Sequence, residues 1–240
     1  MQTTSALYKQ IVATSGHWIE TKLSISGNEI MEDQIISVQR DEQAMQQAKP
    51  SAGGAMAASI ALTIIAPNFT IPRMGEIDVY TRARTDTLTS EWIPTGVYFI
   101  DTRAHDQSAD GIGLMRITAY DAMLKGEQDY PNTTHNWPYL DTLVVAEIAA
   151  AIGVAVDSRT AGFLTSSYMI DMPVGYTIRE VLGHIAASYG GNFVITDENK
   201  LLFIPLYGLD PEDSIVGEYL AVEGSTEALL FGNEGWYILV

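Results

Sequence analysis

The sequence contains no cysteine in 240 residues. Disulfide bonds are therefore excluded, and so are zinc and iron–sulfur sites that need cysteine ligands. A chain without cysteines fits assembly in a reducing cytoplasm, where thiols stay reduced. Apolar residues make up 47% of the chain and charged residues 18%. This composition is that of a folded protein with a substantial core and not that of a disordered tail.

Basic residues are scarce. The chain has 13 lysines and arginines against 30 aspartates and glutamates, so its formal net charge is -17. An acidic surface repels the phosphates of nucleic acids, and we therefore expect no sequence-specific binding of DNA or RNA. Two interpretations of the acid surplus stay open. It either keeps the protein soluble, or it lines a channel to which passing DNA does not adhere.

Long apolar runs are also missing. The N-terminal segment, MQTTSALYKQIVATSG, lacks the apolar core of a signal peptide. One stretch without any charge, Pro50–Pro72, contains AMAASIALTIIA, but glycines, serines, threonines and a further proline interrupt it. A membrane-spanning helix needs about 20 mostly apolar residues in a row. We therefore expect no membrane span, and we interpret this stretch as a loop followed by a buried strand.

No motif for catalysis or cofactor binding is present. The sequence has no P-loop, no dinucleotide-binding glycine pattern, no G-x-S-x-G elbow and no H-E-x-x-H spacing. His184 follows Glu180 by one helical turn, a pair that could hold a metal with a third ligand, but we favour an exposed histidine. We predict no cofactor, no metal site and no enzymatic activity. The other histidines are His17, His105 and His135.

Two acids next to other functional groups keep an enzymatic alternative open. A glycosidase needs two carboxylates, one of them in an apolar pocket. Glu91 beside Trp92 fits that requirement, and Asp101 near Arg103 fits it as well. With 30 acids in the chain such neighbours arise by chance, so we favour solvated acids. The aromatic residues of Trp92–Phe99 could form a platform for sugars, but alternation along a strand favours a half-buried edge of the core.

The first half of the chain has the pattern of β-strands. Short runs rich in isoleucine, valine, tryptophan and tyrosine are separated by turn residues such as Ser15-Gly16. In Trp18–Ile25, the odd-numbered residues form a candidate buried face. Several short strands at regular spacing are typical of a barrel or sandwich. The predicted strands are Tyr8–Thr14, Trp18–Ile25, Gln34–Gln39, Ala57–Ile65, Glu76–Arg82, Gly96–Asp101 and Ile112–Tyr120.

Helical patterns begin near residue 120. Asp121 can cap a short helix over Ala122–Gln128. The segment Asp141–Ile152 repeats apolar residues at helical spacing, with Asp141 or Thr142 as its cap and a glycine directly after it. We therefore expect two helices in this region, the second longer than the first.

A capping box gives the clearest local signal. Thr177 and Glu180 have the spacing at which each side chain accepts a hydrogen bond from the other's backbone N–H. Apolar residues then recur at helical spacing until Gly190-Gly191 ends the helix. A hairpin follows, and the last part of the chain holds two more β-like runs. The predicted strands here are Phe193–Thr196, Leu201–Leu206, Ile215–Val222 and Trp236–Val240.

The order of these patterns predicts an α+β fold that is mainly β. A run of strands comes first, helices and a hairpin follow, and strands return at the end. We predict a β-barrel domain at residues 1–118 and 207–240, with a small α/β domain at residues 119–206 inserted into it.

Four segments carry a resemblance to a known family. Their sequences resemble, in the same order, the N-terminal hub region of tail proteins from prophages and siphophages of Gram-positive bacteria. That region is similar in design to the baseplate hub of contractile phages and to the spike-carrying proteins of type VI secretion. The segments are IPRMGEIDVYTR (Ile71–Arg82), SEWIPTGVYFIDTR (Ser90–Arg103), TAYDAMLKGEQDYP (Thr118–Pro131) and PVGYTIREVLGHIAASYGGNFVITDENKLLFIPL (Pro173–Leu206).

The resemblance implies a β-barrel hub domain and a structural protein of the virion. Hubs of this family are homotrimers whose protomers each contribute two related barrels, so that the ring matches the hexameric rings of the tail tube. The hub joins the tube and the distal tail proteins to a spike or fibre, and DNA passes through it. The expected location is the tail tip or baseplate of the virion, after assembly in the cytoplasm of the host bacterium.

The sequence departs from the family at its end. A single barrel and its insertion are complete before the chain ends, whereas a family hub has a second barrel. The apolar terminus Gly235–Val240 favours a fragment of a longer hub, because a natural chain seldom ends in an unpaired apolar strand. A subunit that assembles differently is the alternative.

Two classes of function follow. We favour a structural hub subunit that binds copies of itself, the tail tube, distal tail proteins and a spike or fibre. The alternative is a tail-associated cell-wall hydrolase or glycan-binding module. We expect assembly contacts on the loop Arg84–Ser90 and on the uncharged segment Ser51–Met56. The candidate contact residues are Arg84, Thr85, Asp86, Ser90, Ser51 and Met56.

Overall fold

The computed structural model describes residues 4–42, 51–107, 111–131 and 136–206, and the strands at 220–221, 228–232 and 235–239. The helices are α1 (Ala6–Val12), η1 (Glu32–Gln34), η2 (Ala122–Glu127), α2 (Asp141–Ile152), α3 (Ser158–Phe163) and α4 (Ile178–Ser188), of which η1 and η2 are 3-10 helices. None of the helices in these ranges is long and apolar enough to cross a membrane.

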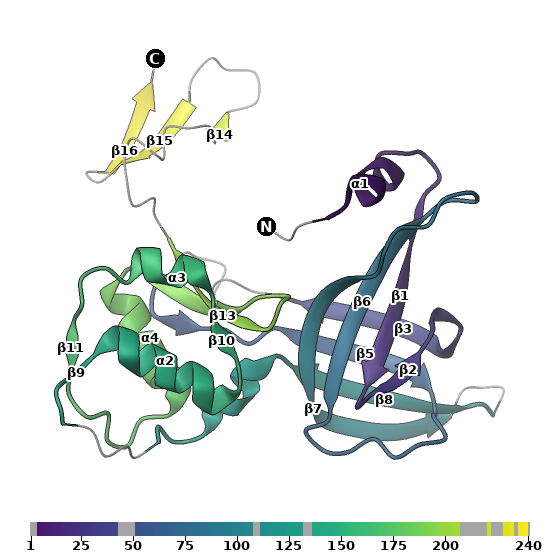
Figure 1. The fold of residues 1–240 in the computed structure, drawn as a ribbon, viewed down its shortest axis with the longest axis horizontal. Helices are drawn as coiled ribbons and strands as arrows, with labels where there is room; N and C mark the ends of the chain where they lie inside the picture. The colour runs from purple at the N-terminus through teal and green to yellow at the C-terminus, as the bar shows by residue number, and fades with distance from the viewer. Residues whose placement is uncertain are drawn as a thin grey trace.

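The strands of the described residues belong to four separate sheets, and Figure 1 labels them in chain order. The first half contains β1 (Trp18–Ile25), β2 (Asn28–Ile30), β3 (Ile35–Asp41), β4 (Gly54–Ala55), β5 (Ser59–Ile65), β6 (Glu76–Arg84), β7 (Ile93–Gln107) and β8 (Gly113–Tyr120). The second half contains β9 (Tyr139–Leu140), β10 (Ala155–Val156), β11 (Met169–Ile170), β12 (Gly191–Ile195), β13 (Lys200–Pro205), β14 (Leu220–Ala221), β15 (Ala228–Gly232) and β16 (Gly235–Leu239).

A seven-stranded antiparallel sheet, in the order β2-β1-β6-β7-β8-β5-β3, curls into a half-barrel (Figure 1). Alternation along β5 directs Ile60, Leu62 and Ile64 to the inner face, where each is at most 2% exposed. The predicted α+β, mainly β class is therefore confirmed. The buried core of the half-barrel consists of Leu23, Ile25, Ile30, Ile60, Leu62, Ile64, Ile71, Ile77, Val79, Tyr98, Ile100, Met115, Ile117 and Ala119.

Irregular pairing bends the central strands of the half-barrel. The register of β6 and β7 shifts between Val79 and Tyr80, and such bulges increase local twist. Gly96 pairs with Val79 at this shift and has φ +148°. A Cβ at this position would lie 2.6 Å from the ring of Tyr98. Glycine therefore allows the Tyr98 ring to pack closely against the strand in the core.

Part of the sheet continues beyond the barrel as an arm, which we define as residues 18–22 and 80–84 with the hairpin 85–90 (Figure 1). The inner face of the arm is covered by α1, whose Ile11 is fully buried. Ile19 lies on the predicted buried face of β1 but is 43% exposed, because the barrel core ends near Leu23 and only the short α1 covers this part.

The predicted strand Tyr8–Thr14 is wrong, since Ala6–Val12 forms helix α1. The hydroxyl of Ser5 caps this helix by accepting a hydrogen bond from the backbone N–H of Tyr8 at 3.0 Å. A short apolar run fits both the two-residue period of a strand and the 3.6-residue period of a helix. Ser5 was not recognised from the sequence as the cap that favours the helix.

The second sheet, in the order β10-β13-β12-β4, forms an α/β module with η2, α2, α3 and α4. The helix Asp141–Ile152 is confirmed with both its bounds, and Gly153 ends it at φ +80°. The capping box of Thr177 and Glu180 is confirmed as well. The module's core consists of Ala55, Met123, Tyr130, Val144, Val145, Ile148, Ala149, Ile152, Leu164, Ile178, Val181, Leu182, Ile185, Ala186, Phe193, Leu201 and Phe203.

Two local predictions for the module need correction. Asp141 is the first residue inside its helix and not the cap, since Leu140 occupies the N-cap position. The segment Ser51–Met56 is not a loop throughout, because β4 pairs in parallel with β12 across about 140 residues of sequence, with Asn192 opposite Gly54.

The C-terminal strands β14, β15 and β16 form a three-stranded antiparallel sheet with one another. We expected Ile215–Val222 and Trp236–Val240 to return to the half-barrel. Within the described parts of these segments, the strands pair only inside their own sheet. The assignment of residues 207–240 to the barrel domain stays a prediction.

Candidate functional site

The outer face of the arm carries a ladder of charged and aromatic side chains. Glu20 lies at its centre and is only 9% exposed. Nε of Arg82 donates to its Oε2 at 2.6 Å, and Nη1 of Arg84 donates to its Oε1 at 2.7 Å. Burial acts to raise the pKa of Glu20, but the hydrogen bonds from Arg84 and Arg82 outweigh it and lower the pKa. Glu20 is therefore held as a carboxylate between two guanidinium groups.

Aromatic rings extend the ladder, since the guanidinium of Arg84 also lies 5.9 Å from the ring centroid of Trp18. The guanidinium of Arg82 lies 4.2 Å from the ring centroid of Trp92, and Nζ of Lys22 lies 5.3 Å from the same ring. Such contacts contribute about 0.5–1 kcal/mol each at exposed sites. The side chains on the outer face of the arm are thus held together by ion pairs and by contacts between cations and aromatic rings, and not by apolar packing. The register pairs of the ladder are Trp18 with Arg84, Glu20 with Arg82 and Lys22 with Tyr80.

One edge of the arm has no partner strand in the described residues, because β2 pairs with β1 only from Leu23 onward. The two-residue turn between β1 and β2 makes Ile25 and Leu23 direct their N–H and C=O groups toward β2. By alternation, Thr21 and Ile19 direct theirs out of the sheet on the same side. Exposed Trp18 (39%) and Ile19 (43%) lie along this edge. An edge of this kind can accept a strand from another chain.

The predicted contact residues of the loop Arg84–Ser90 lie at the tip of the arm. Ser90 is buried, and its Oγ accepts a hydrogen bond from Ala83 N–H at 2.9 Å, so it closes the hairpin. Thr85 Oγ1 accepts from Leu88 N–H at 3.1 Å. Asp86 is exposed, whereas Arg84 is half-buried in the ladder. The structure thus leaves Asp86 as the predicted residue with the most accessible side chain.

The other two predicted contact residues lie in the α/β module. The carbonyl of Ser51 accepts a hydrogen bond from Nδ2 of Asn192 at 2.9 Å, and Met56 N–H donates to the carbonyl of Phe193 at 2.9 Å. Both are half-buried. The two predicted surfaces are therefore not brought together, and their role in assembly stays a prediction.

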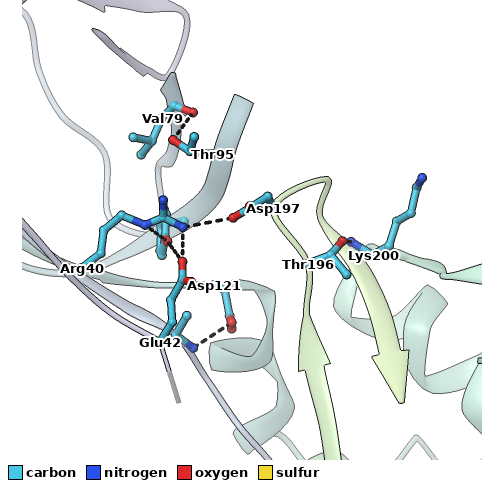
Figure 2. A network of polar contacts seen from close by, with 10 residues as sticks. Arg40, Glu42, Val79, Thr95, Asp121, Thr196, Asp197 and Lys200 are labelled. Carbon is cyan, nitrogen blue, oxygen red and sulfur yellow. Dashed lines mark hydrogen bonds and ion pairs between the residues drawn. The ribbon is translucent and has the colours of Figure 1, made fainter. Parts of the chain in front are cut away.

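A polar network joins the half-barrel to the module (Figure 2). Arg40 on β3 donates through Nε to the hydroxyl of Tyr98 at 3.0 Å and through Nη2 to Asp197 Oδ1 at 3.0 Å. Arg40 also forms an ion pair with Glu42. Burial raises the pKa of Tyr98 to about 12, although Arg40 opposes the rise. Since Asp197 belongs to the turn between β12 and β13, Arg40 connects both sheets.

Asp121 is the second link of this junction, and it is only 4% exposed. Its Oδ2 accepts a hydrogen bond from Ala58 N–H at 2.8 Å, and its Oδ1 accepts from Met123 N–H at 2.9 Å. Burial raises the pKa of Asp121 to about 6, against the two backbone hydrogen bonds and the charge of Arg179. A cavity of about 650 Å³ adjoins it, lined also by Glu42, Met56 and the hairpin of β12 and β13.

The acids and histidines considered for catalysis have other partners. Glu91 accepts hydrogen bonds from N–H and Oγ of Ser5 at 3.0 and 2.7 Å, and these bonds lower its pKa. Glu180 accepts from Thr177 N–H in the capping box. Within the described ranges no three His, Asp or Glu side chains are grouped to hold a metal ion. His135 lies outside those ranges.

The aromatic run Trp92–Phe99 does not form an open platform. Tyr98 and Phe99 are 2% and 7% exposed, and the Lys125 ammonium lies 3.6 Å from the centroid of the Phe99 ring. Arg103 donates to the carbonyl of Ile71. Sequence reasoning missed Arg40 and the role of Asp121 in joining the two sheets. Nothing local marks Arg40, because its partner Asp197 is 157 residues away.

Comparisons with known proteins give a likeness in structure only, since no family model and no curated protein matches the sequence. The 43 kDa tail protein of prophage MuSo2 from Shewanella oneidensis is similar with a TM-score of 0.56 and 13% identity, over 80% of this chain and 57% of that chain. The tail protein from Neisseria meningitidis MC58 is similar with a TM-score of 0.53 and 15% identity, over 78% of this chain and 50% of that chain. At these identities the likeness concerns the fold, and this chain spans about half of either protein.

Proposed function

We propose that this protein is a structural subunit of a bacteriophage tail and that it acts without enzymatic activity. The likeness of fold to the two tail proteins, over 80% and 78% of this chain, is the observation that carries the proposal. A structural role needs a rigid body with a surface for neighbouring subunits. The stacked arm and the junction supply the rigidity, and the unpaired edge of β1 supplies such a surface.

Within the tail, we propose a hub subunit at the tip or baseplate that assembles as a homotrimeric ring around the DNA channel. The edge of β1 at Ile19 and Thr21 then pairs with a strand of a neighbouring copy. A contact between two different surfaces of identical chains closes into a ring when the rotation is right. The tail tube, distal tail proteins and a spike or fibre are its further partners.

The net charge of -17 supports a channel that does not retain DNA. Most lysines and arginines among the described residues form ion pairs with acids of the same chain. The acids in surplus therefore have no basic side chain of this protein to neutralise them. Phosphates are repelled by such a surface. The paired cations are Lys22, Arg40, Arg82, Arg84, Arg116, Arg159, Arg179 and Lys200.

The structure does not favour Glu91 as the catalytic acid of a cell-wall hydrolase. A glycosidase acid needs a raised pKa so that it is protonated when it acts. Hydrogen bonding from Ser5 lowers the pKa of Glu91 instead. Incubation with purified cell walls tests this point, and clearing that disappears in Glu91→Gln would reinstate the alternative.

Light scattering and electron microscopy test the structural proposal. The purified protein is measured alone and after mixing with the tail-tube protein of the same phage. We expect a mass that is a multiple of the 26.2 kDa chain and class averages with a central opening. A species that stays monomeric at high concentration and does not bind the tube protein would refute the proposal.

A further inference from the structure

A pocket of about 540 Å³ opens on the side of the α/β module where β11 and its following loop meet α4. Its volume lies within the range of ligand pockets in proteins. Aromatic, thioether and aliphatic side chains line it together with the polar residues Asp141, Asp171, His184 and Ser188. Its aromatic and thioether lining includes Tyr168, Met169, Met172, Tyr176 and Tyr189.

Asp141 is the most deeply buried polar residue of the lining, at 1% exposed, and its carboxylate forms the base of the pocket. Its Oδ2 accepts hydrogen bonds from the hydroxyl of Tyr189 at 2.5 Å and from Tyr168 N–H at 3.3 Å. Its Oδ1 accepts from Thr142 N–H at 2.6 Å. Asp141 forms no ion pair within the described part of the chain, and its donors are a hydroxyl and backbone N–H groups, one of them at the N-terminus of α2. A buried carboxylate of this kind favours a cation nearby.

The walls of the pocket are aromatic rings. The rings of Tyr168 and Tyr189 lie 5.1 Å apart between centroids at 60°, and the ring of Tyr176 meets His184 edge-on at 5.2 Å. Tyr168 is 46% exposed and Tyr176 45%, so both remain open to a partner. The faces of such rings are negative and attract cations.

Methionine side chains form the rim of the pocket. Met169 is 57% exposed and Met172 is 38% exposed. Flexible thioethers adapt to varied apolar groups, and aromatic and methionine residues are enriched in protein interfaces. The rim therefore suits an aliphatic stem, whereas the base and walls suit a positive charge.

We propose that this pocket receives a lysine or arginine side chain from the surface of a partner protein. The aliphatic stem packs on Met169 and Met172, and the cation lies against the exposed rings of Tyr168 and Tyr176 on the side of Asp141. A basic partner complements a chain whose net charge is -17. The inference goes beyond the proposed function, because it holds wherever in a tail the protein is located and does not use the edge of β1.

Chemical-shift titration of methyl-labelled methionines tests the proposal on the full chain. The probes are the Nα-acetyl methylamides of lysine, arginine and norleucine, together with choline. Lysine or arginine amide should shift the signals of Met169 and Met172 saturably with a millimolar Kd. The neutral norleucine amide should bind at least several-fold more weakly. Equal binding of norleucine, or no shift with either basic amide, would overturn the proposal.

Choline distinguishes the two sources of a cation. A quaternary ammonium ion carries the same charge without the stem of an amino-acid side chain. Weaker binding of choline than of the lysine and arginine amides is expected if the rim recognises the stem. Tighter binding of choline would overturn the assignment to a protein side chain and would assign the pocket to a small-molecule ammonium.

Variants locate the binding in the pocket. Tyr176→Ala removes one exposed ring and should weaken the basic amides roughly two- to fivefold. Asp141→Asn removes the charge and should weaken them further, and thermal melts report whether this buried substitution still folds. Leu143→Ala is the matched control, because Leu143 is similarly exposed at 42% on the same module but does not line the pocket. Unchanged affinity in Tyr176→Ala, or a loss in Leu143→Ala, contradicts the proposed site.

Discussion

Asp121 and Ala58 hold each other by two hydrogen bonds. The backbone N–H of Asp121 donates to the carbonyl of Ala58 at 3.0 Å, and Ala58 N–H donates to Oδ2 of Asp121 at 2.8 Å. Asp121 directly follows β8, and Ala58 directly precedes β5. The two bonds therefore tie together two of the places where the chain crosses between the half-barrel and the α/β module, the one between β4 and β5 and the one after β8.

Asp121 makes folding stability depend on pH. Its pKa is about 6 in the folded protein against a usual value of 3.8, so the folded state binds this proton more tightly than the unfolded state. Stability from this group is present below about pH 4 and is lost as pH rises through about 6, by up to roughly 3 kcal/mol. Urea unfolding at pH 4, 5, 6 and 7 measures the effect.

Asp121→Asn isolates this contribution, because asparagine does not titrate. The free energy of unfolding of the native protein, relative to Asp121→Asn, should fall between about pH 4 and 6. Asp86→Asn changes an exposed acid at the arm tip and should leave the native profile unchanged. A difference between native and Asp121→Asn that is flat or rises with pH would show that Asp121 is not protonated preferentially in the folded state.

Gly183 marks a close approach between α4 and the segment before β4. A Cβ at Gly183 would lie 2.7 Å from the carbonyl oxygen of Gly53. Alanine favours a helix by about 1 kcal/mol over glycine. The clash with backbone should outweigh that gain, so we expect Gly183→Ala to lower stability by about 1–3 kcal/mol.

Gly162 in α3 is the matched control for this substitution. No atom lies within 4 Å of a Cβ built there, and its φ is not positive. Gly162→Ala should leave stability unchanged or raise it by up to about 1 kcal/mol. Thermal melts of both variants provide the comparison. Equal effects of the two alanines would mean that the contact between Gly183 and Gly53 does not limit packing.

The arm ladder predicts unequal roles for two glutamates. The side chain of Glu20 is 11% exposed between Arg82 and Arg84, whereas that of Glu29 is 63% exposed beside Lys22. Glu20→Gln should lower stability by about 1–3 kcal/mol, because it leaves two half-buried guanidinium groups without a carboxylate. Glu29→Gln should change it by less than about 1 kcal/mol. Urea unfolding followed by tryptophan fluorescence measures the free energy of unfolding of both variants. Equal decreases would contradict the central role of Glu20 in the ladder.

Local signals account for the parts of the fold that the sequence predicts well. The capping box at Thr177 and the glycine after Ile152 act within a few residues of the helix ends that they determine. The apolar run Ala57–Ile65 likewise predicted a buried strand, which is β5. These elements need no partner elsewhere in the chain to be recognised.

Contacts between distant segments account for what the sequence did not reveal. Gly54 and Ala55 form a strand only because Asn192 and Phe193 lie beside them. Ser90 is in a polar loop by sequence, but its hydroxyl is buried because the hairpin folds back on Ala83. The aromatic pocket had a partial signal, since two tyrosines and two methionines lie between residues 168 and 176 in a segment without a helical or strand period.

The unpaired edge of β1 predicts a variant that blocks assembly without unfolding the protein. Thr21 directs its N–H away from β6, so proline at this position removes a donor that the half-barrel does not use. Proline is tolerated on edge strands for this reason. We expect Thr21→Pro to fold and to lose self-association in light scattering. Thr21→Val keeps the N–H and the branched side chain, and it should assemble as the native protein does.

A charge on the same edge tests the contact without changing the backbone. Native proteins protect exposed edges with lysine, because pairing would bury its charge. Ile19 is 43% exposed and belongs to this edge, so Ile19→Lys should fold and should also lower the assembled mass. Circular dichroism confirms the fold of each variant before its mass is compared. If both Thr21→Pro and Ile19→Lys are folded and assemble with the native mass, subunits of this protein meet through another surface, and the edge of β1 has no part in the ring.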